Sequence, residues 1–428
     1  MVEVWLPYGR TEVSMRVPDE NFQRTVEPKD GNPVEDPALE VELALQNPVG
    51  SKPVSSMVGP DDKVVLVVDD ATRPRPAHPI IPQVVEELIH SGVRSENIAL
   101  LIGLGLHKAP SGEEIEQITG TASATGLKIS SHDCKSNLTH VGDTTHGTNV
   151  FLSKTFVEAD VKILTGDIEL HHFAGYGGGR KSVLPGISAE ETILQNHALS
   201  LHPKARAGVL EGNPVNEDMM EAAEMAKVDF IVNVVLNQKK DIVKTFSGDL
   251  RQAFLKGTQT IDKLCKIKCE SKADIVVVSP GGNPRDLNLS QALKAVYQTL
   301  DIVKEGGAMV LVAECPEGEG SQSFGEWMMR SEGSRQIEHA IKKRFSIGAH
   351  DAYYLTKALE KAKIYLVSTI PDHYVSSIFK MRPSRTANAA IQTALRSVGK
   401  DSKVTVIPYG AFTLPIVQEY STAEPTHS

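Results

Sequence analysis

The chain has 428 residues, of which 40% are hydrophobic and 23% are charged, and its net charge at pH 7 is −9. This length predicts two domains, because single hydrophobic cores stop growing beyond about 250–300 residues. The acidic balance disfavours nucleic acid and acidic membrane surfaces as partners, and no apolar run is long enough to span a bilayer. The first residues lack the basic and apolar regions of a secretion signal, and the four cysteines form no CxxC pair. We therefore expect a cytoplasmic protein with reduced cysteines.

Short β-branched runs alternate with amphipathic stretches along most of the chain, which predicts α/β domains with mainly parallel sheets. The expected strands are 63–68, 98–102, 161–164, 230–235, 275–278, 309–312, 364–367 and 404–407. The expected helices include 82–90, 215–226, 290–304 and 351–361. The first fifty residues differ, and they predict a hairpin packed on the first domain and a proline-rich loop over 28–53. A charged, weakly periodic segment around 265–272 marks the expected boundary, which gives domains of residues 1–270 and 271–428.

Polar motifs directly follow four of the expected strands. DDATRP begins at Asp69, GLGLH ends at His107, the run VKILTGDIEL leads into His171, and GGNPRD begins at Gly281. Ligands of open parallel sheets bind at the carboxyl ends of strands, so these motifs are expected to converge. Three of them fall in the first expected domain and one in the second, which predicts an active-site cleft between the domains.

The most distinctive stretch is HHFAGYGGGRKSVLPGISAEETILQNH, residues 171–197. Its glycines let the backbone turn sharply and approach a ligand closely. Ser188 and Glu191 have the spacing of a capping box, which predicts a helix beginning near Ala189. Lys181 in the turn and His197 on the helix are then expected to point at one pocket.

The segment GYGGGRKS also suggests a phosphate-binding loop, but that pattern needs a glycine immediately before the lysine, where this chain has Arg180. Glycine amides with Arg180, Lys181 and a helix N-terminus still make an anion-binding nest. A phosphate-ester or nucleotide-handling transferase therefore stays open, as does an ordinary turn with a solvated Arg-Lys pair. His107 and His171 fit a pair of acid and base better than zinc ligands, because the histidine spacings match no zinc motif.

Together these motifs resemble the lactate racemase family, whose members use a nickel-pincer nucleotide. The matching pieces are DDATRP, GLGLH, the 171–197 stretch and GGNPRDLNLSQALK, with a weaker match in GAHDAYYLTKAL. The resemblance implies a racemase or epimerase of 2-hydroxy acids, in which hydride passes reversibly to the cofactor through a 2-keto acid. Soft sulfur donors in square-planar geometry suit the nickel(II) of such a cofactor. The implied partners are a small 2-hydroxy-acid anion and the enzymes that make and load the cofactor.

The resemblance also implies roles for individual residues. Lys181 would carry the cofactor, a Ni(II) pyridinium-3-thioamide-5-thiocarboxylic acid mononucleotide, through a thioamide, and His197 would supply a nitrogen ligand to nickel. His107 and His171 would each handle the hydroxyl proton, one for each enantiomer. Further contacts would come from Asp70, Thr72, Gly178, Gly179, Arg180 and Tyr354 to the cofactor, and from Arg73, Ser290, Gln291 and Lys294 to the substrate.

Ser290 departs from the family pattern, since lactate-acting members carry a tyrosine before the glutamine. A smaller polar residue enlarges the pocket, so we expect the substrate to be malate, a longer aliphatic 2-hydroxy acid or a sugar acid as readily as lactate. A cofactor-free binding protein of the same fold is the remaining alternative, because cofactor loading depends on other enzymes.

Overall fold

The computed structural model describes residues 1–70, 77–120 and 126–417. Thr72 and Arg73, predicted to contact cofactor and substrate, lie outside the described residues. The chain divides into two compact units: Asp30–Leu264, called here the central unit, and Met1–Lys29 with the chain from Cys265 onwards, called the terminal unit. The division after residue 264 falls at the predicted boundary segment, whereas the first 29 residues belong with the C-terminal half instead of the predicted 1–270 domain.

The central unit is built on a six-stranded sheet in the order β13-β12-β9-β4-β5-β6. Its strands are β4 (Val64–Asp69), β5 (Ile98–Gly103), β6 (Lys128–Ser131), β9 (Val161–Asp167), β12 (Phe230–Leu236) and β13 (Ile242–Gly248). All neighbours pair in parallel except β13, which is an antiparallel edge strand. The predicted strands of this region are confirmed. The strand order reverses between β4 and β9, and such switch points are where open α/β sheets bind ligands.

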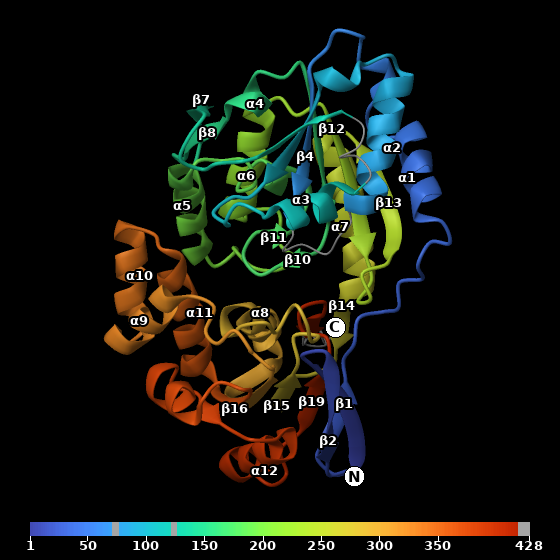
Figure 1. Ribbon diagram of the computed structural model, residues 1–428. Helices are drawn as coiled ribbons and strands as arrows, with labels where there is room; N and C mark the ends of the chain where they lie inside the picture. Colours follow the sequence, from blue (N-terminus) through green and yellow to red (C-terminus); the bar gives the residue numbers. More distant parts are fainter. Residues whose placement is uncertain (71–76, 121–125, 418–428) are drawn as a thin grey trace, which may run out of the picture. The chain divides into compact units, whose positions relative to one another are not determined.

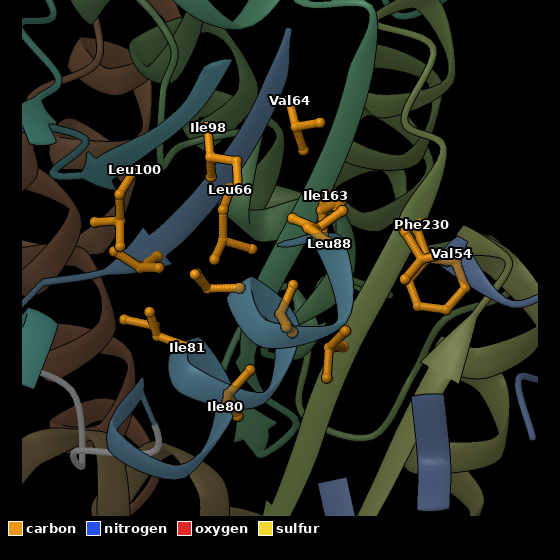
Figure 2. Packing of buried hydrophobic residues seen from close by; sticks show 14 of the residues in the cluster. Val54, Val64, Leu66, Ile80, Ile81, Leu88, Ile98, Leu100, Ile163 and Phe230 are labelled. Atoms are coloured by element: carbon orange, nitrogen blue, oxygen red, sulfur yellow. The ribbon is translucent and has the colours of Figure 1, made fainter. Parts of the chain in front are cut away.

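The sheet of the central unit is apolar on both faces, as expected for parallel strands covered by helices. On one face, the side chains of β4, β5 and β9 pack against α2 (Ala77–His90). In Figure 2, Ile81 and Leu88 of this helix lie against the strands that carry Leu66 and Ile163, and all four side chains are fully buried. Burying each such side chain stabilises the fold by roughly 1.5–3 kcal/mol. This packing fixes the positions of the strand ends.

Shorter elements complete the central unit (Figure 1). They are α1 (Pro37–Gln46), α3 (Gly112–Thr119), β7 (Leu138–Asp143), β8 (Asn149–Ser153), α4 (Lys154–Val157), β10 (Leu170–His171), β11 (Gly175–Tyr176), α5 (Glu190–Ala198), α6 (Pro214–Met225) and α7 (Leu250–Cys265). The prediction of a loop throughout 28–53 is wrong, because α1 lies within it. Asp36 caps this helix through the amides of Ala38 and Leu39, and Pro37 takes the first helical position, where its missing N–H costs nothing.

The terminal unit has a six-stranded sheet, all parallel, in the order β18-β17-β16-β15-β19-β3. Its strands and helices are β1 (Val2–Tyr8), β2 (Thr11–Val17), β3 (Phe22–Thr25), β14 (Lys266–Cys269), β15 (Ala273–Val278), α8 (Leu289–Thr299), β16 (Val303–Val312), α9 (Gln322–Arg330), α10 (Ser334–Lys343), α11 (Ile347–Lys361), β17 (Lys363–Val367), β18 (Arg382–Pro383), α12 (Ala387–Val398), β19 (Val404–Ile407) and β20 (Leu414–Val417). The predicted helix 290–304 is too long, because β16 begins at Val303. The predicted α/β class with mainly parallel sheets is confirmed.

The N-terminal hairpin belongs to this unit for two reasons. β3 pairs with β19 and extends the sheet, and Leu6 and Met15 of the hairpin are buried in the same core as Ile275 of β15. Sequence pattern does not reveal which sheet a detached hairpin joins. Among the described residues, no helix is both long and apolar enough to cross a membrane.

Candidate functional site

A histidine and a carboxylate meet at the switch point of the central sheet. Asp70 follows β4 and His107 follows the neighbouring β5, and Oδ2 of Asp70 lies 2.5 Å from Nδ1 of His107. The side chain of Asp70 is only 8% exposed, whereas that of His107 is 53% exposed. An ionised carboxylate can only accept, so Nδ1 carries the hydrogen and Nε2 is the acceptor nitrogen of the neutral ring. The ring of His107 is therefore arranged to take a proton at Nε2.

The loop after β9 gathers aromatic rings around Phe173. The ring of His171 lies 4.5 Å from that of Phe173, and the ring of His172 lies 4.7 Å from it. His197 of α5 contacts the same phenyl ring at 5.1 Å. Phe173 is buried, while the three histidines are partly exposed. The predicted proton-transfer residue His171 and the predicted nickel ligand His197 thus share one buried neighbour, which sequence reasoning missed.

His171 is held in the opposite tautomer to His107. The backbone N–H of Ala174 donates to its Nδ1 at 3.2 Å, so the neutral ring carries its hydrogen on Nε2. In this state Nε2 of His171 is a hydrogen-bond donor, whereas Nε2 of His107 is an acceptor. The two neutral rings therefore carry their hydrogen on different nitrogens, Nδ1 in His107 and Nε2 in His171.

Lys181 lies on a tight turn, the 3₁₀ segment Gly179–Ser182, and its side chain is partly buried. The turn needs glycine at 178, where φ is +75° and a Cβ would lie 2.8 Å from the carbonyl oxygen of Asp167. The amide of Gly179 donates to Oδ1 of the buried Asn233 on β12 at 2.8 Å. The turn therefore lies against two strands of the sheet: Gly178 packs closely on Asp167 of β9, and Gly179 is hydrogen-bonded to Asn233 of β12. Asn233 was missed because a lone asparagine in an apolar strand carries no local motif.

Arg180 has a different role from the one predicted. Its side chain is fully buried, and its guanidinium donates to three backbone carbonyls of the glycine-rich loop and to Oδ1 of Asn216 at 2.9 Å. It also lies 4.3 Å above the ring of Phe254. Burial lowers the pKa of Arg180 to about 9. This value is still above neutral pH, so the guanidinium remains charged. Neither a solvated Arg-Lys pair nor a guanidinium bound to a cofactor phosphate is compatible with this burial, so both interpretations of Arg180 are wrong.

The helix that carries His197 begins where the sequence places it, but not for the predicted reason. α5 begins at Glu190 with Ala189 as its N-cap, and no side chain caps it. Ser188 is fully buried and its hydroxyl donates to the carbonyl of Val183 at 2.7 Å. The capping-box prediction is therefore wrong, because Ser188 secures the preceding loop instead of the helix end.

The predicted substrate residues of the terminal unit cluster at the start of α8. Nζ of Lys294 donates to Oε1 of Gln291 at 2.7 Å, so the two side chains lie on the same face of the helix. The hydroxyl of Ser290 donates to Oδ2 of Asp351 on α11 at 2.5 Å. Also on α11, Tyr354 packs its ring 5.2 Å from the ring of Tyr297. These contacts bring the predicted residues of this unit into one neighbourhood, while their contacts with cofactor and substrate stay predictions.

Comparison with known proteins identifies the family. The family model of the lactate racemase N-terminal domain matches residues 8–208, and that of the lactate racemase C-terminal domain matches residues 268–414. The lactate racemase of Thermoanaerobacterium thermosaccharolyticum is 32% identical over 421 residues, covering 96% of this chain and 98% of the relative. The lactate racemase of Lactiplantibacillus plantarum is 31% identical, covering 96% of this chain and 99% of the relative. The chain belongs to the lactate racemase family.

Solved structures agree with this assignment. The lactate racemase apoprotein from T. thermosaccharolyticum matches with a TM-score of 0.91 at 31% identity, covering 98% of this chain and all of that chain. A protein from Thermotoga maritima matches with a TM-score of 0.69 at 17% identity, covering 91% of this chain and all of that chain, which supports the fold alone.

The described residues fit the nickel cofactor that the lactate racemase resemblance implies. Among them, no group of three or more His, Cys, Asp or Glu side chains is placed to hold a metal ion. In the arrangement that the resemblance implies, the cofactor would supply the other nickel donors and His197 would be the ligand from the protein. Nδ1 of His197 lies 3.2 Å from Oδ1 of Asn196, which makes Nε2 the acceptor nitrogen that a metal requires.

Proposed function

We propose that this protein is a racemase or epimerase of 2-hydroxy acids that works with a nickel-pincer nucleotide attached to Lys181. The observation that carries the proposal is the pairing of His107 with Asp70 at the switch point of the central sheet, where the adjoining strand β9 leads to His171 and Lys181. Two imidazole rings and a lysine amine are thereby supplied from neighbouring strand ends.

The reaction removes a hydride from C2 and a proton from the hydroxyl group, and returns both to give either enantiomer. When bound, the cofactor supplies the hydride acceptor. His107 takes the hydroxyl proton at Nε2, and the carboxylate of Asp70 stabilises the imidazolium that results. Removing the C2 hydrogen as a proton would instead build up a dianion next to the carboxylate, which this route avoids.

His171 serves the opposite enantiomer. To accept a proton at Nε2 its ring must move the hydrogen to Nδ1, which breaks the 3.2 Å bond from the Ala174 amide. Losing a neutral hydrogen bond costs about 0.5–1.5 kcal/mol. This cost is roughly a tenfold factor in rate, small beside the hundredfold or more that a positioned base contributes, so both histidines remain competent.

The substrate extends beyond lactate in this proposal. Lys294 contacts the substrate carboxylate in this proposal, with Gln291 beside it, and the role of Arg73 stays a prediction. Ser290 leaves the volume that a tyrosine takes in lactate-acting members, and its bond to Asp351 adds a polar wall suited to a hydroxylated or acidic substituent. A phosphate-transferring activity has lost its best support, because Arg180 is buried in the fold. The cytoplasmic location stays a prediction.

The test is to purify the protein from a host that makes the nickel cofactor. We expect intact-protein mass to show an adduct of nucleotide size, metal analysis to show nickel, and chiral chromatography to show interconversion of one or more of lactate, malate and longer 2-hydroxy acids. Lys181→Ala is the matched control and should lose both the adduct and the activity. An adduct that persists in Lys181→Ala would refute the attachment, and loaded protein that leaves every enantiomer unchanged would refute the racemase and leave a binding protein.

A further inference from the structure

We propose that Asp218 and Asn196 are positioning residues that fix the tautomer of His197, so that Nε2 is the nitrogen that binds nickel. The metal in this statement rests on the proposed function, whereas the tautomer follows from the hydrogen bonds of the chain itself. The three residues form one line of contacts from the buried helix α6 to the ring of His197 on α5.

The line begins at a buried carboxylate. Asp218 is fully buried, and it accepts hydrogen bonds from the hydroxyls of Thr144 and Thr148 and from Nδ2 of Asn196. The bond from Asn196 is 2.8 Å long and the bond from Thr148 is 2.9 Å long. Because an ionised carboxylate has no hydrogen to donate, it requires the NH₂ group of Asn196 to face it.

The second amide hydrogen of Asn196 is also committed. Nδ2 donates to the backbone carbonyl of Val215 at 3.2 Å, and Asn196 is fully buried. Turning the amide over would place its oxygen against the oxygens of Asp218 and Val215, so the carbonyl of Val215 would lose this donor and Asp218 would lose one of its three donors. Each buried group left unsatisfied in this way costs about 1–3 kcal/mol. The amide is therefore held in one orientation.

That orientation leaves Oδ1 of Asn196 facing Nδ1 of His197 at 3.2 Å. Since Oδ1 can only accept, Nδ1 of the neutral ring must be the donor, and the lone pair resides on Nε2. The edge contact with Phe173 at 5.1 Å further restrains the ring plane. Metal-bound histidines commonly donate their other ring N–H to such a partner, and losing it typically costs 10–100-fold in metal affinity.

The experiment uses protein labelled with ¹⁵N-histidine and prepared without the cofactor. Two-bond ¹H–¹⁵N spectra distinguish the two neutral tautomers, and the signal of His197 is assigned by its loss in His197→Gln. We expect the Nδ1–H form in the wild type and a loss of that preference in Asn196→Ala. Asn196→Asp should keep it, because the new carboxyl group can donate to Asp218 with one oxygen and accept from His197 with the other.

Thr192→Val is the matched control for a merely structural effect. Thr192 is a fully buried hydroxyl on the same helix, but it bonds to Asn149 and Phe151 instead of His197. The control should lower the unfolding temperature without changing the tautomer. In cofactor-loaded protein, Asn196→Ala should retain nickel about 10–100-fold less well during dialysis, with the lysine adduct intact.

The possible results separate the two proposals. A wild-type tautomer signal in Asn196→Ala overturns the positioning role, and so does an equal loss of nickel in Thr192→Val. If the wild type binds no nickel at all, the proposed function fails, while the tautomer result in cofactor-free protein still decides whether Asn196 controls His197.

Discussion

Asp70→Asn removes the charge that His107 depends on while keeping the shape of the side chain. The carboxylate lies 2.5 Å from Nδ1 and is almost fully buried, whereas the ring of His107 is 53% exposed, so solvent screens the interaction from the side of the ring. A hydrogen bond to a charged group contributes about 1.5–3 kcal/mol, which corresponds to a loss of about 10–150-fold in rate. The amide can also present its NH₂ group to Nδ1 and reverse the tautomer, in which case the loss rises toward about 10⁴-fold, as it does in other carboxylate–histidine pairs.

The assay is the initial rate of conversion of each pure enantiomer by cofactor-loaded protein, followed by chiral chromatography. We expect kcat to fall with little change in KM, because Asp70 acts through His107 and not on bound substrate. The double variant Asp70→Asn with His107→Ala should be no slower than His107→Ala alone. If Asp70→Asn slows the His107→Ala protein by the same factor as the wild type, Asp70 does not act through this histidine.

The same variant distinguishes the two roles of Asp70. The resemblance implies a contact with the cofactor, whereas the structure pairs the carboxylate with His107. Cofactor loading, measured as the fraction of protein with the nucleotide-sized adduct, should be unchanged in Asp70→Asn if the histidine is its main partner. A loss of adduct in proportion to the loss of rate would favour the cofactor contact.

Two further predictions concern buried cationic and titratable groups. Arg180→Lys should lower the free energy of unfolding in urea by about 3 kcal/mol or more, because a single ammonium group cannot bond to all the carbonyls that the guanidinium binds. A decrease below about 1 kcal/mol would contradict this prediction. His132 is buried with Nε2 2.9 Å from the carbonyl of Ser188, and burial lowers its pKa below the usual 6.5. The unfolded chain then binds the proton more readily, so this contribution to stability is present above about pH 6.5 and is lost as the pH falls toward the folded-state pKa. His132→Gln should flatten the dependence of unfolding free energy on pH in that window, and an unchanged slope would exclude His132 as its source.

The strands of both sheets were predictable because their signal is local. Residues 64–68 form an unbroken apolar run that is rich in valine, which is typical of a parallel strand buried on both faces of its sheet. The polar residues that end these runs, Asp70 and His107, were predictable as site residues for the same reason. Their pairing follows from the adjacency of β4 and β5, which the sequence implies only once a parallel order is assumed.

What the sequence could not reveal are the partners that long-range folding supplies. Asn233 lies in an apolar strand and binds the glycine turn, and Asp218 lies in an ordinary helix and binds Asn196. The residues next to them in the chain identify neither partner. Arg180 was misassigned because an arginine beside a lysine in a glycine-rich loop is typical of anion sites, whereas the loop here folds around its guanidinium. Ser188 was misassigned because a capping box is recognised by spacing alone, and a competing carbonyl lay within reach.

The three site histidines owe their chemistry to three different partners. A carboxylate faces Nδ1 of His107, a side-chain amide oxygen faces Nδ1 of His197, and a backbone N–H faces Nδ1 of His171. The two oxygens require a hydrogen on Nδ1 and leave Nε2 as acceptor, which suits a base and a metal ligand. The N–H does the reverse and makes His171 a donor. Of these three partners the carboxylate is the charged one, and it stabilises the imidazolium that forms when His107 takes the hydroxyl proton. Because two enantiomers have equal free energies, kcat/KM must be the same in both directions, so His107→Ala should lower kcat/KM equally for the two enantiomers. A value near that of the wild type would argue against His107 as a catalytic base.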